Sequence, residues 1–171
     1  MIVVGDSSAL ITLSVIGQLH LLENLYGGVF IPHAVYDEVV VQGAGRAGVS
    51  EVRDADFIWV EELGSSDQVA LYTDEVSPQD AAVIVLAKEK GADFIITRDR
   101  GLQRTARREG ISIMNVRVLL LAAKREGLIT AVKPLLDEMR NRGILMREGI
   151  YQETLRQAGE ADNSHTSQDA S

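Results

Sequence analysis

The chain has 171 residues, 46% of them hydrophobic and 25% charged, which is the composition of one ordinary globular domain and excludes a disordered or fibrous chain. It has no cysteine, which excludes disulfides, thiolate zinc sites and cysteine nucleophiles, so any metal ion is expected to bind oxygen. No apolar run approaches the roughly 20 residues that span a bilayer, and the first strand has no basic leader before it. We therefore expect a cytoplasmic protein.

The net charge is −8, which by itself argues against a polyanionic partner such as nucleic acid. The distribution of charge changes this conclusion. Residues 158–171 carry three acidic residues and no basic one, so the rest of the chain has a net charge of −5. Acidic residues that bind a metal ion would also not present free negative charge to a partner.

The first half of the chain is predicted to contain a strand, two helices, a second strand and a third helix. In order, these elements span Ile2–Gly5, Ser8–Ile16, Gln18–Leu25, Val29–Ile31 and Pro32–Val41. Pro32 suits the first turn of its helix, where a missing amide costs nothing. The glycine-rich stretch Gly43–Gly48 is expected to be a mobile loop.

The second half alternates strands and helices. Its predicted elements are the strands Phe57–Val60, Asp93–Thr97 and Ile111–Met114 and the helices Asp80–Lys90, Gly101–Glu109, Val116–Glu126, Ala131–Asn141 and Arg147–Gln157. Alternation of this kind predicts an α/β fold, a three-layer α/β/α sandwich with a central, mostly parallel sheet. We expect one domain over residues 1–157 and a disordered acidic tail over 158–171.

Four carboxylates fall at the ends of predicted elements. Asp6 and Asp99 each follow a buried-type strand, and the carboxyl ends of parallel strands meet at the edge where α/β sheets bind ligands. Asp80 begins a helix behind the N-cap Ser77 and Pro78, so a favourable helix-terminal charge is the more ordinary explanation of this residue taken alone. Glu38 competes with Asp37, since the sequence does not fix the phase of their helix.

Several carboxylates at one edge suit a divalent metal ion. Magnesium and manganese prefer hard oxygen ligands, and such ions activate water and neutralise charge on a phosphate during phosphodiester hydrolysis. This chemistry needs no side-chain nucleophile, which agrees with the absence of cysteine. We therefore expect Mg²⁺ or Mn²⁺ as the cofactor.

The segments 4–11, 31–39, 80–87 and 96–100 resemble, in this order, the four acidic motifs of PIN-domain nucleases, and the closest branch is the VapC-like one. The resemblance implies a metal-dependent endoribonuclease, often a homodimer and commonly the toxin of a toxin–antitoxin pair with a cognate antitoxin. It assigns the catalytic positions to Asp6, Glu38, Asp80 and Asp99, and metal binding to Asp6, Asp80 and Asp99. Ser7 or Thr97 would be a hydroxyl neighbour of the substrate or of a ligand.

One departure from the family pattern is Arg98, which stands where many relatives carry a second acid. Arg98, Arg100 and Arg104 are predicted to bind the substrate backbone, because the arginines from Arg100 onward recur at helical spacing beside Asp99. A solvated helix balanced by Glu109 explains the same spacing.

Three other functions remain open from the sequence. Arg98 is also compatible with a catalytically weakened PIN module that acts as an RNA- or protein-binding scaffold. An aspartate-phosphorylating enzyme also places acids at strand ends, although a haloacid-type phosphatase would want a second aspartate at Ser8. DNA is an alternative substrate, because no element that senses a 2′-hydroxyl is evident.

Overall fold

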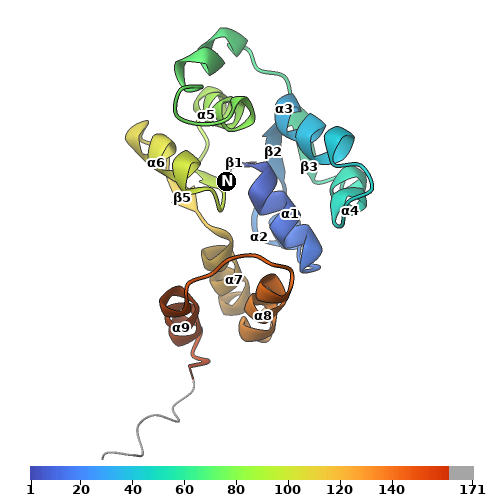
Figure 1. Cartoon of the computed structure of the whole chain (residues 1–171), viewed down its shortest axis with the longest axis vertical. Helices are drawn as coiled ribbons and strands as arrows, with labels where there is room; N and C mark the ends of the chain where they lie inside the picture. The colour runs from blue at the N-terminus through green and yellow to red at the C-terminus, as the bar shows by residue number, and fades with distance from the viewer. Residues whose placement is uncertain (162–171) are drawn as a thin grey trace, which may run out of the picture. The chain divides into compact units, whose positions relative to one another are not determined.

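The computed structural model describes residues 1–161 and divides into two compact units, Met1–Val118 and a second that starts at Leu119 (Figure 1). We call them the N-terminal and C-terminal units. No helix within residues 1–161 is long and apolar enough to cross a membrane. Most of the predicted tail, residues 162–171, lies outside the described residues.

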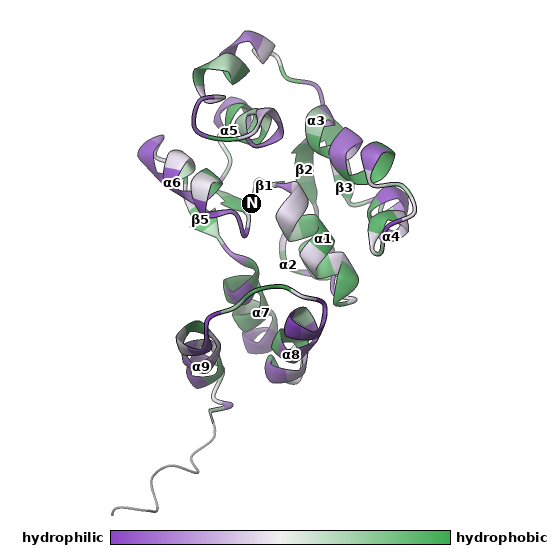
Figure 2. Cartoon of the chain, viewed as in Figure 1, coloured by the Kyte–Doolittle hydropathy of each residue, from purple (hydrophilic) through white to green (hydrophobic). Residues whose placement is uncertain are grey.

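The N-terminal unit contains a five-stranded, all-parallel sheet, which confirms the predicted α/β class. Its strands are β1 (Val3–Gly5), β2 (Val29–Pro32), β3 (Ile58–Glu61), β4 (Phe94–Ile96) and β5 (Ile113–Met114), in the spatial order β3-β2-β1-β4-β5. All residues of β1 and β4 are buried, as expected for central strands of a covered parallel sheet. Figure 2 shows hydrophobic colouring on β2, whereas α6 has mixed colouring with hydrophilic residues.

The strand order places a topological switch point between β1 and β4. From β1 the chain first builds β2 and β3 on one side and then crosses to build β4 and β5 on the other. Gly5 is in register with Ile96, and the Asp6 amide donates to the Ile96 carbonyl at 3.3 Å. The carboxyl ends of β1 and β4 are therefore side by side, which is where open α/β sheets form their ligand crevice.

The helices largely follow the predicted pattern. The N-terminal unit contains α1 (Ser7–Val15), α2 (Leu21–Tyr26), α3 (His33–Tyr36), α4 (Val49–Asp54), α5 (Pro78–Lys90) and α6 (Arg100–Arg108), and the C-terminal unit contains α8 (Lys133–Asn141) and α9 (Glu148–Gln157). Helix α7 (Val116–Arg125) spans the boundary. The start of α5 is as predicted, with the Ser77 hydroxyl accepting from the Asp80 amide at 3.1 Å and Pro78 in the first turn.

Three local features differ from the prediction. Pro32 ends β2 in an extended conformation, and the expected single helix after it is α3 followed by a π-helix, η1 (Asp37–Gln42). Neither α4 nor the 3₁₀-helix η2 (Ser66–Leu71) was predicted. Each has only six residues, which is too short for a clear hydrophobic period.

The end of the described chain is held in the C-terminal unit. The Glu160 carboxylate accepts hydrogen bonds from the amides of Val132 at 2.8 Å and Lys133 at 2.9 Å. It also pairs with Lys124 at 3.0 Å. Glu160 falls in the stretch that the sequence assigned to the tail, so ordered structure continues at least this far.

Gly28 offers a test of how β2 and β3 pack. Its φ of +150° is open only to glycine, and a Cβ here would lie 2.5 Å from the Trp59 ring and 2.6 Å from the Phe57 carbonyl oxygen. We expect Gly28→Ala to lower the free energy of unfolding by about 2 kcal/mol or more, from strain and overpacking. Gly64→Ala is the control, because its Cβ would come no closer than 3.6 Å to a neighbour. It should change the free energy of unfolding by less than about 0.5 kcal/mol. Urea titrations measure both, and equal losses would contradict this account.

Candidate active site

A pocket of about 460 Å³ lies at the carboxyl ends of β1 and β4. Its lining comes from the starts of α1, α5 and α6, from η1 and from the segment before α5. The lining residues are Asp6, Ser7, Ser8, Glu38, Glu75, Val76, Ser77, Asp80, Asp99 and Gly101. All four carboxylates that the sequence analysis singled out therefore face one cavity.

Asp6 is the most buried of these carboxylates, with 1% of its surface exposed. As the N-cap of α1 it accepts the Ala9 amide at 2.9 Å, and it accepts the Thr97 hydroxyl at 2.5 Å. The Ser8 hydroxyl lies within 2.9 Å of both carboxylate oxygens. Burial raises the pKa of Asp6 to about 6, although the bonds from Thr97, Ala9 and Ser8 favour the ionised form.

Two hydroxyls link Asp6 to the loop that carries Asp99. The Thr97 hydroxyl accepts the Asp99 amide at 2.9 Å, and the Ser8 hydroxyl accepts the Arg98 amide at 2.9 Å. Thr97, predicted to contact the substrate, is completely buried and does not line the pocket. Ser7 does line it. The sequence analysis missed Ser8 as a partner of Asp6, although a hydroxyl two residues after a strand-end acid was the available signal.

Asp80 and Asp99 both stand at helix N-termini. The Asp99 carboxylate caps α6 by accepting the Leu102 amide at 2.7 Å. The pKa of Asp80 rises to about 7, first because the group is partly buried and then because of the charges of Asp6, Asp99 and Glu38, with the Ser77 hydroxyl opposing the rise. The four carboxylates therefore form one electrostatically coupled group.

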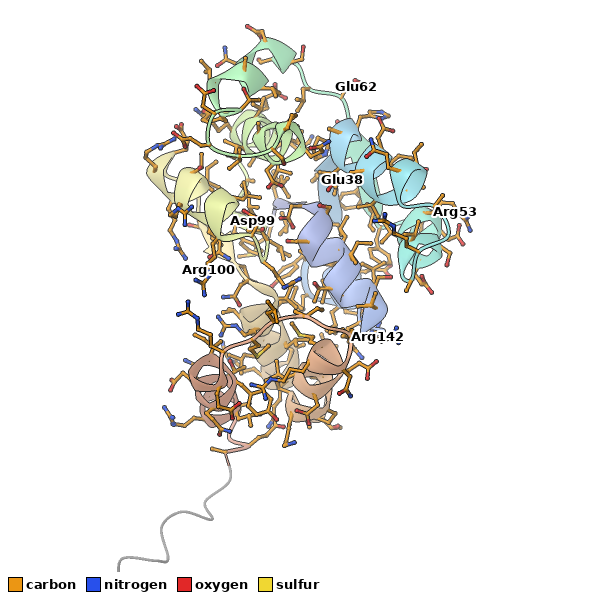
Figure 3. All side chains as sticks on the ribbon, viewed as in Figure 1. Glu38, Arg53, Glu62, Asp99, Arg100 and Arg142 are labelled. Carbon is orange, nitrogen blue, oxygen red and sulfur yellow. The ribbon has the colours of Figure 1, made fainter. Side chains whose placement is uncertain are left out.

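The helix η1 turns Glu38, and not Asp37, toward the pocket. Glu38 is partly buried and lines the pocket, whereas Asp37 is exposed and does not. Figure 3 shows Glu38 on η1 and Asp99 at the start of α6.

A further pocket carboxylate, Glu75, was not predicted, because it lies in an irregular segment. It pairs with Arg108 at 2.5 Å and accepts a hydrogen bond from the Thr105 hydroxyl at 3.1 Å.

The basic residues near Asp99 differ in burial and in their partners. Arg98 is half-buried, does not line the pocket, and donates from Nε to the Thr12 hydroxyl at 2.6 Å. Three others, Arg100, Arg104 and Arg107, are exposed and form no ion pair with any described residue. Glu109, the expected counter-charge of this helix, pairs with Lys88 at 3.0 Å instead.

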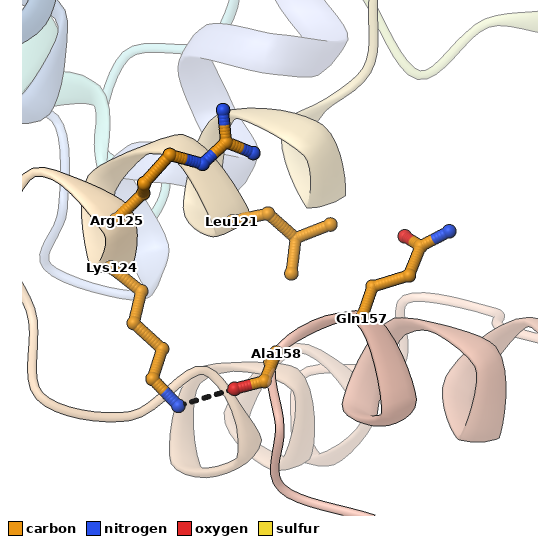
Figure 4. A pocket seen from close by; sticks show the side chains of 5 residues that line it. All are labelled: Leu121, Lys124, Arg125, Gln157 and Ala158. Carbon is orange, nitrogen blue, oxygen red and sulfur yellow. Dashed lines mark hydrogen bonds between the residues drawn. The ribbon is translucent and has the colours of Figure 1, made fainter.

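No three His, Cys, Asp or Glu side chains within residues 1–161 already form a metal-ligand cluster. The C-terminal unit has a second cavity, of about 430 Å³, lined by Leu121, Lys124, Arg125, Gln157 and Ala158 (Figure 4). Its lining contains no carboxylate, so the acidic group lies entirely in the N-terminal unit.

Comparison with known proteins identifies the family of the chain. A family model described as a PIN domain matches residues 2–160. No curated protein matches the chain. PIN domains are generally nucleases that use divalent metal ions and bind nucleic acid. The match covers nearly the whole chain, and this protein therefore belongs to the PIN-domain family.

Proposed function

We propose that this protein is a cytoplasmic, Mg²⁺- or Mn²⁺-dependent endoribonuclease that hydrolyses RNA phosphodiester bonds. The observation that carries the proposal is the convergence of Asp6, Glu38, Asp80 and Asp99 on one pocket, where their charges are coupled. Structural carboxylates usually pair with basic groups, whereas this set faces a cavity. Coupled, partly buried acids in a cleft are typical of functional sites.

The donors in the pocket fit a hard divalent cation. Ser8, Ala9 and Thr97 use three of the roughly four acceptor positions of the Asp6 carboxylate, which leaves room for one further bond. The second carboxylate oxygen of Asp99 accepts no hydrogen bond from any described residue, while the first caps α6. A bound cation would also offset the repulsion that raises the Asp80 pKa.

The four predicted carboxylates divide into two roles in the proposed reaction. Asp6, Asp80 and Asp99 would hold the ion, which when bound supplies a more acidic water and neutralises charge on the phosphate. Glu38, on η1, would accept a proton from the attacking water or orient it. Ser7, one of the three serines that line the pocket, would contact the substrate.

The exposed arginines of α6 would bind the RNA backbone. Arg100, Arg104 and Arg107 lie on one face at spacings of four and three residues, beside Asp99. A backbone held along this face would reach the pocket at the N-terminus of α6. Phosphate contacts of this kind give affinity without sequence preference.

The resemblance to VapC-like proteins further suggests a homodimeric toxin that a cognate antitoxin inhibits. We also propose that residues 1–157 act as one PIN-like domain. A scaffold without catalytic activity and a nuclease that prefers DNA are the competing outcomes of the experiments below.

Cleavage of labelled RNA tests the catalytic assignment. We expect Asp6→Asn and Asp99→Asn to reduce the Mn²⁺-dependent rate on the order of 100-fold, because each change keeps the volume and removes charge from the pocket. Asp37→Asn, outside the pocket and one residue before Glu38, should retain activity. Activity that survives EDTA or both pocket substitutions would refute the assignment, and the same assay on DNA tests substrate class.

Asp80→Asn separates stability from activity. At pH 8 in EDTA the variant should be more stable than the parent by about 1–2 kcal/mol, since a pKa unit corresponds to about 1.4 kcal/mol and solvent screens part of the repulsion. The pKa of Asp80 is about 7 in the folded parent and lower in the unfolded chain, so the folded state takes up the proton first as the pH falls. The difference in stability between the variant and the parent should therefore shrink between pH 8 and pH 5. Thermal unfolding with Asp37→Asn as control measures this; a less stable Asp80→Asn protein would contradict it.

Salt dependence tests the arginine face. Each phosphate contact to single-stranded nucleic acid contributes about −0.7 to the slope of log K against log salt. Arg104→Ala should therefore reduce the magnitude of the slope by about 0.7 in anisotropy titrations with EDTA present. Arg53→Ala, on α4 and paired with Asp54 at 2.9 Å, is the control that should leave the slope unchanged (Figure 3). Equal slopes for both variants would place the RNA elsewhere.

A further inference from the structure

Strand β3 forms one edge of the sheet, and its outer side is open. The Val29 amide donates to the Phe57 carbonyl at 2.9 Å, and Val29 is in register with Ile58. Because backbone groups alternate in direction along a strand, Trp59 directs its amide and carbonyl toward β2, whereas Ile58 and Val60 direct theirs away from the sheet. Within residues 1–161, no other strand or loop bonds to these outward groups.

This edge lacks most of the features that usually prevent sheet edges from pairing. Natural edge strands are commonly very short or carry proline, lysine or a bulge. The opposite edge of the sheet, β5, has only two residues. By contrast, β3 has four residues that pair with β2 without a bulge, and it contains neither proline nor lysine. Its one charged residue, Glu61, pairs with Lys90 at 3.5 Å.

Trp59 lies at the centre of this edge and is 40% exposed. Its ring is fixed from within the fold, since its centroid lies 4.8 Å from that of the Phe30 ring and its atoms fill the space beside Gly28. Lys90 covers Phe30 in turn, with its Nζ 4.3 Å from the ring centroid. An aromatic ring that is held in place and partly exposed at a sheet edge is suited to a cross-strand contact.

We propose that β3 is a self-association surface, on which the β3 of a second copy of this chain pairs antiparallel about a twofold axis at Trp59. The outward groups of Ile58 and Val60 lie symmetrically about Trp59, so Ile58 of one copy faces Val60 of the other. Each copy then donates two hydrogen bonds and accepts two. The two Trp59 residues face each other as a non-hydrogen-bonded pair, with their Cα atoms about 4.5 Å apart and their rings on the same face of the joined sheet.

A second copy fits this edge because the strand is its own complement. The same residues supply both sides of the contact, and Glu61 of one copy faces Phe57 of the other rather than another acid. Asp56 and Glu62, just beyond the ends of the strand, approach each other across the axis. Salt screens their repulsion, so association should tighten as the salt concentration rises. The inference rests on the homodimer suggested under the proposed function and does not involve the acidic pocket.

Disulfide trapping tests the register, because the chain has no cysteine of its own. Oxidation of Trp59→Cys should link most of the protein into a covalent dimer, since the paired Cα atoms lie within the range of about 4.4–6.8 Å that a disulfide spans. Glu61→Cys is the matched control, on the same strand and the same face and also partly exposed. The two Glu61 positions are offset by four residues, about 13 Å along the strands, so this variant should not crosslink.

Val60→Pro keeps Trp59 and removes only an outward donor. The Val60 amide makes no bond to β2, so the five-stranded sheet should remain intact. The change deletes two of the four hydrogen bonds across the axis and should raise the dissociation constant in sedimentation experiments at least about 5-fold. Val60→Ala keeps the amide and should leave the constant unchanged. Fluorescence of Trp59, the only tryptophan, should shift to shorter wavelength as the parent associates.

The outcomes separate this interface from the rest of the proposed function. Equal crosslinking of Trp59→Cys and Glu61→Cys, or a parent dimer that Val60→Pro does not weaken, would overturn the interface and leave the homodimer in place. A parent that sediments as a monomer at every soluble concentration would overturn both. If thermal unfolding shows that Trp59→Cys does not fold, the two Val60 variants decide alone. The nuclease assignment is tested separately by the cleavage assay on RNA.

Discussion

The hydrogen bonds between Asp6 and the hydroxyls of Ser8 and Thr97 are the interaction on which the site depends. They join the end of β1 to the loop after β4, across the point where the strand order reverses. Thr97 then holds the amide of Asp99, so the second strand-end carboxylate is placed relative to the first. Glu38 and Asp80 arrive from η1 and α5, elements that begin at the same edge of the sheet.

This arrangement has an electrostatic cost that the fold does not remove. Burial and neighbouring charges raise the pKa values of Asp6 and Asp80, which means that the folded state disfavours their ionised forms. Sites of this kind persist in proteins when the charge serves binding or catalysis, and stability is lost in exchange.

The sequence predicted the parts of the site that depend on strands and helix caps. Asp6 and Asp99 follow fully buried strands, and Ser77 with Pro78 marks the start of α5, so local pattern was sufficient there. The sequence did not decide between Asp37 and Glu38. These residues lie on η1, a π-helix, and the α-helical period used to read the sequence does not give the directions of its side chains. Glu75 was missed since it belongs to an irregular turn segment, and its contacts with Thr105 and Arg108 are tertiary ones that local pattern does not reveal.

The central claim is that the pocket carboxylates hold a divalent ion, and the most direct measurement is a crystal structure of the protein in Mn²⁺ with an anomalous difference map. The account predicts a peak in the pocket, roughly 2.0–2.6 Å from carboxylate oxygens of Asp6, Asp80 and Asp99, the range in which hard divalent ions bind oxygen. A pocket without a peak at saturating Mn²⁺, or a peak held only by residues outside the pocket, would contradict it.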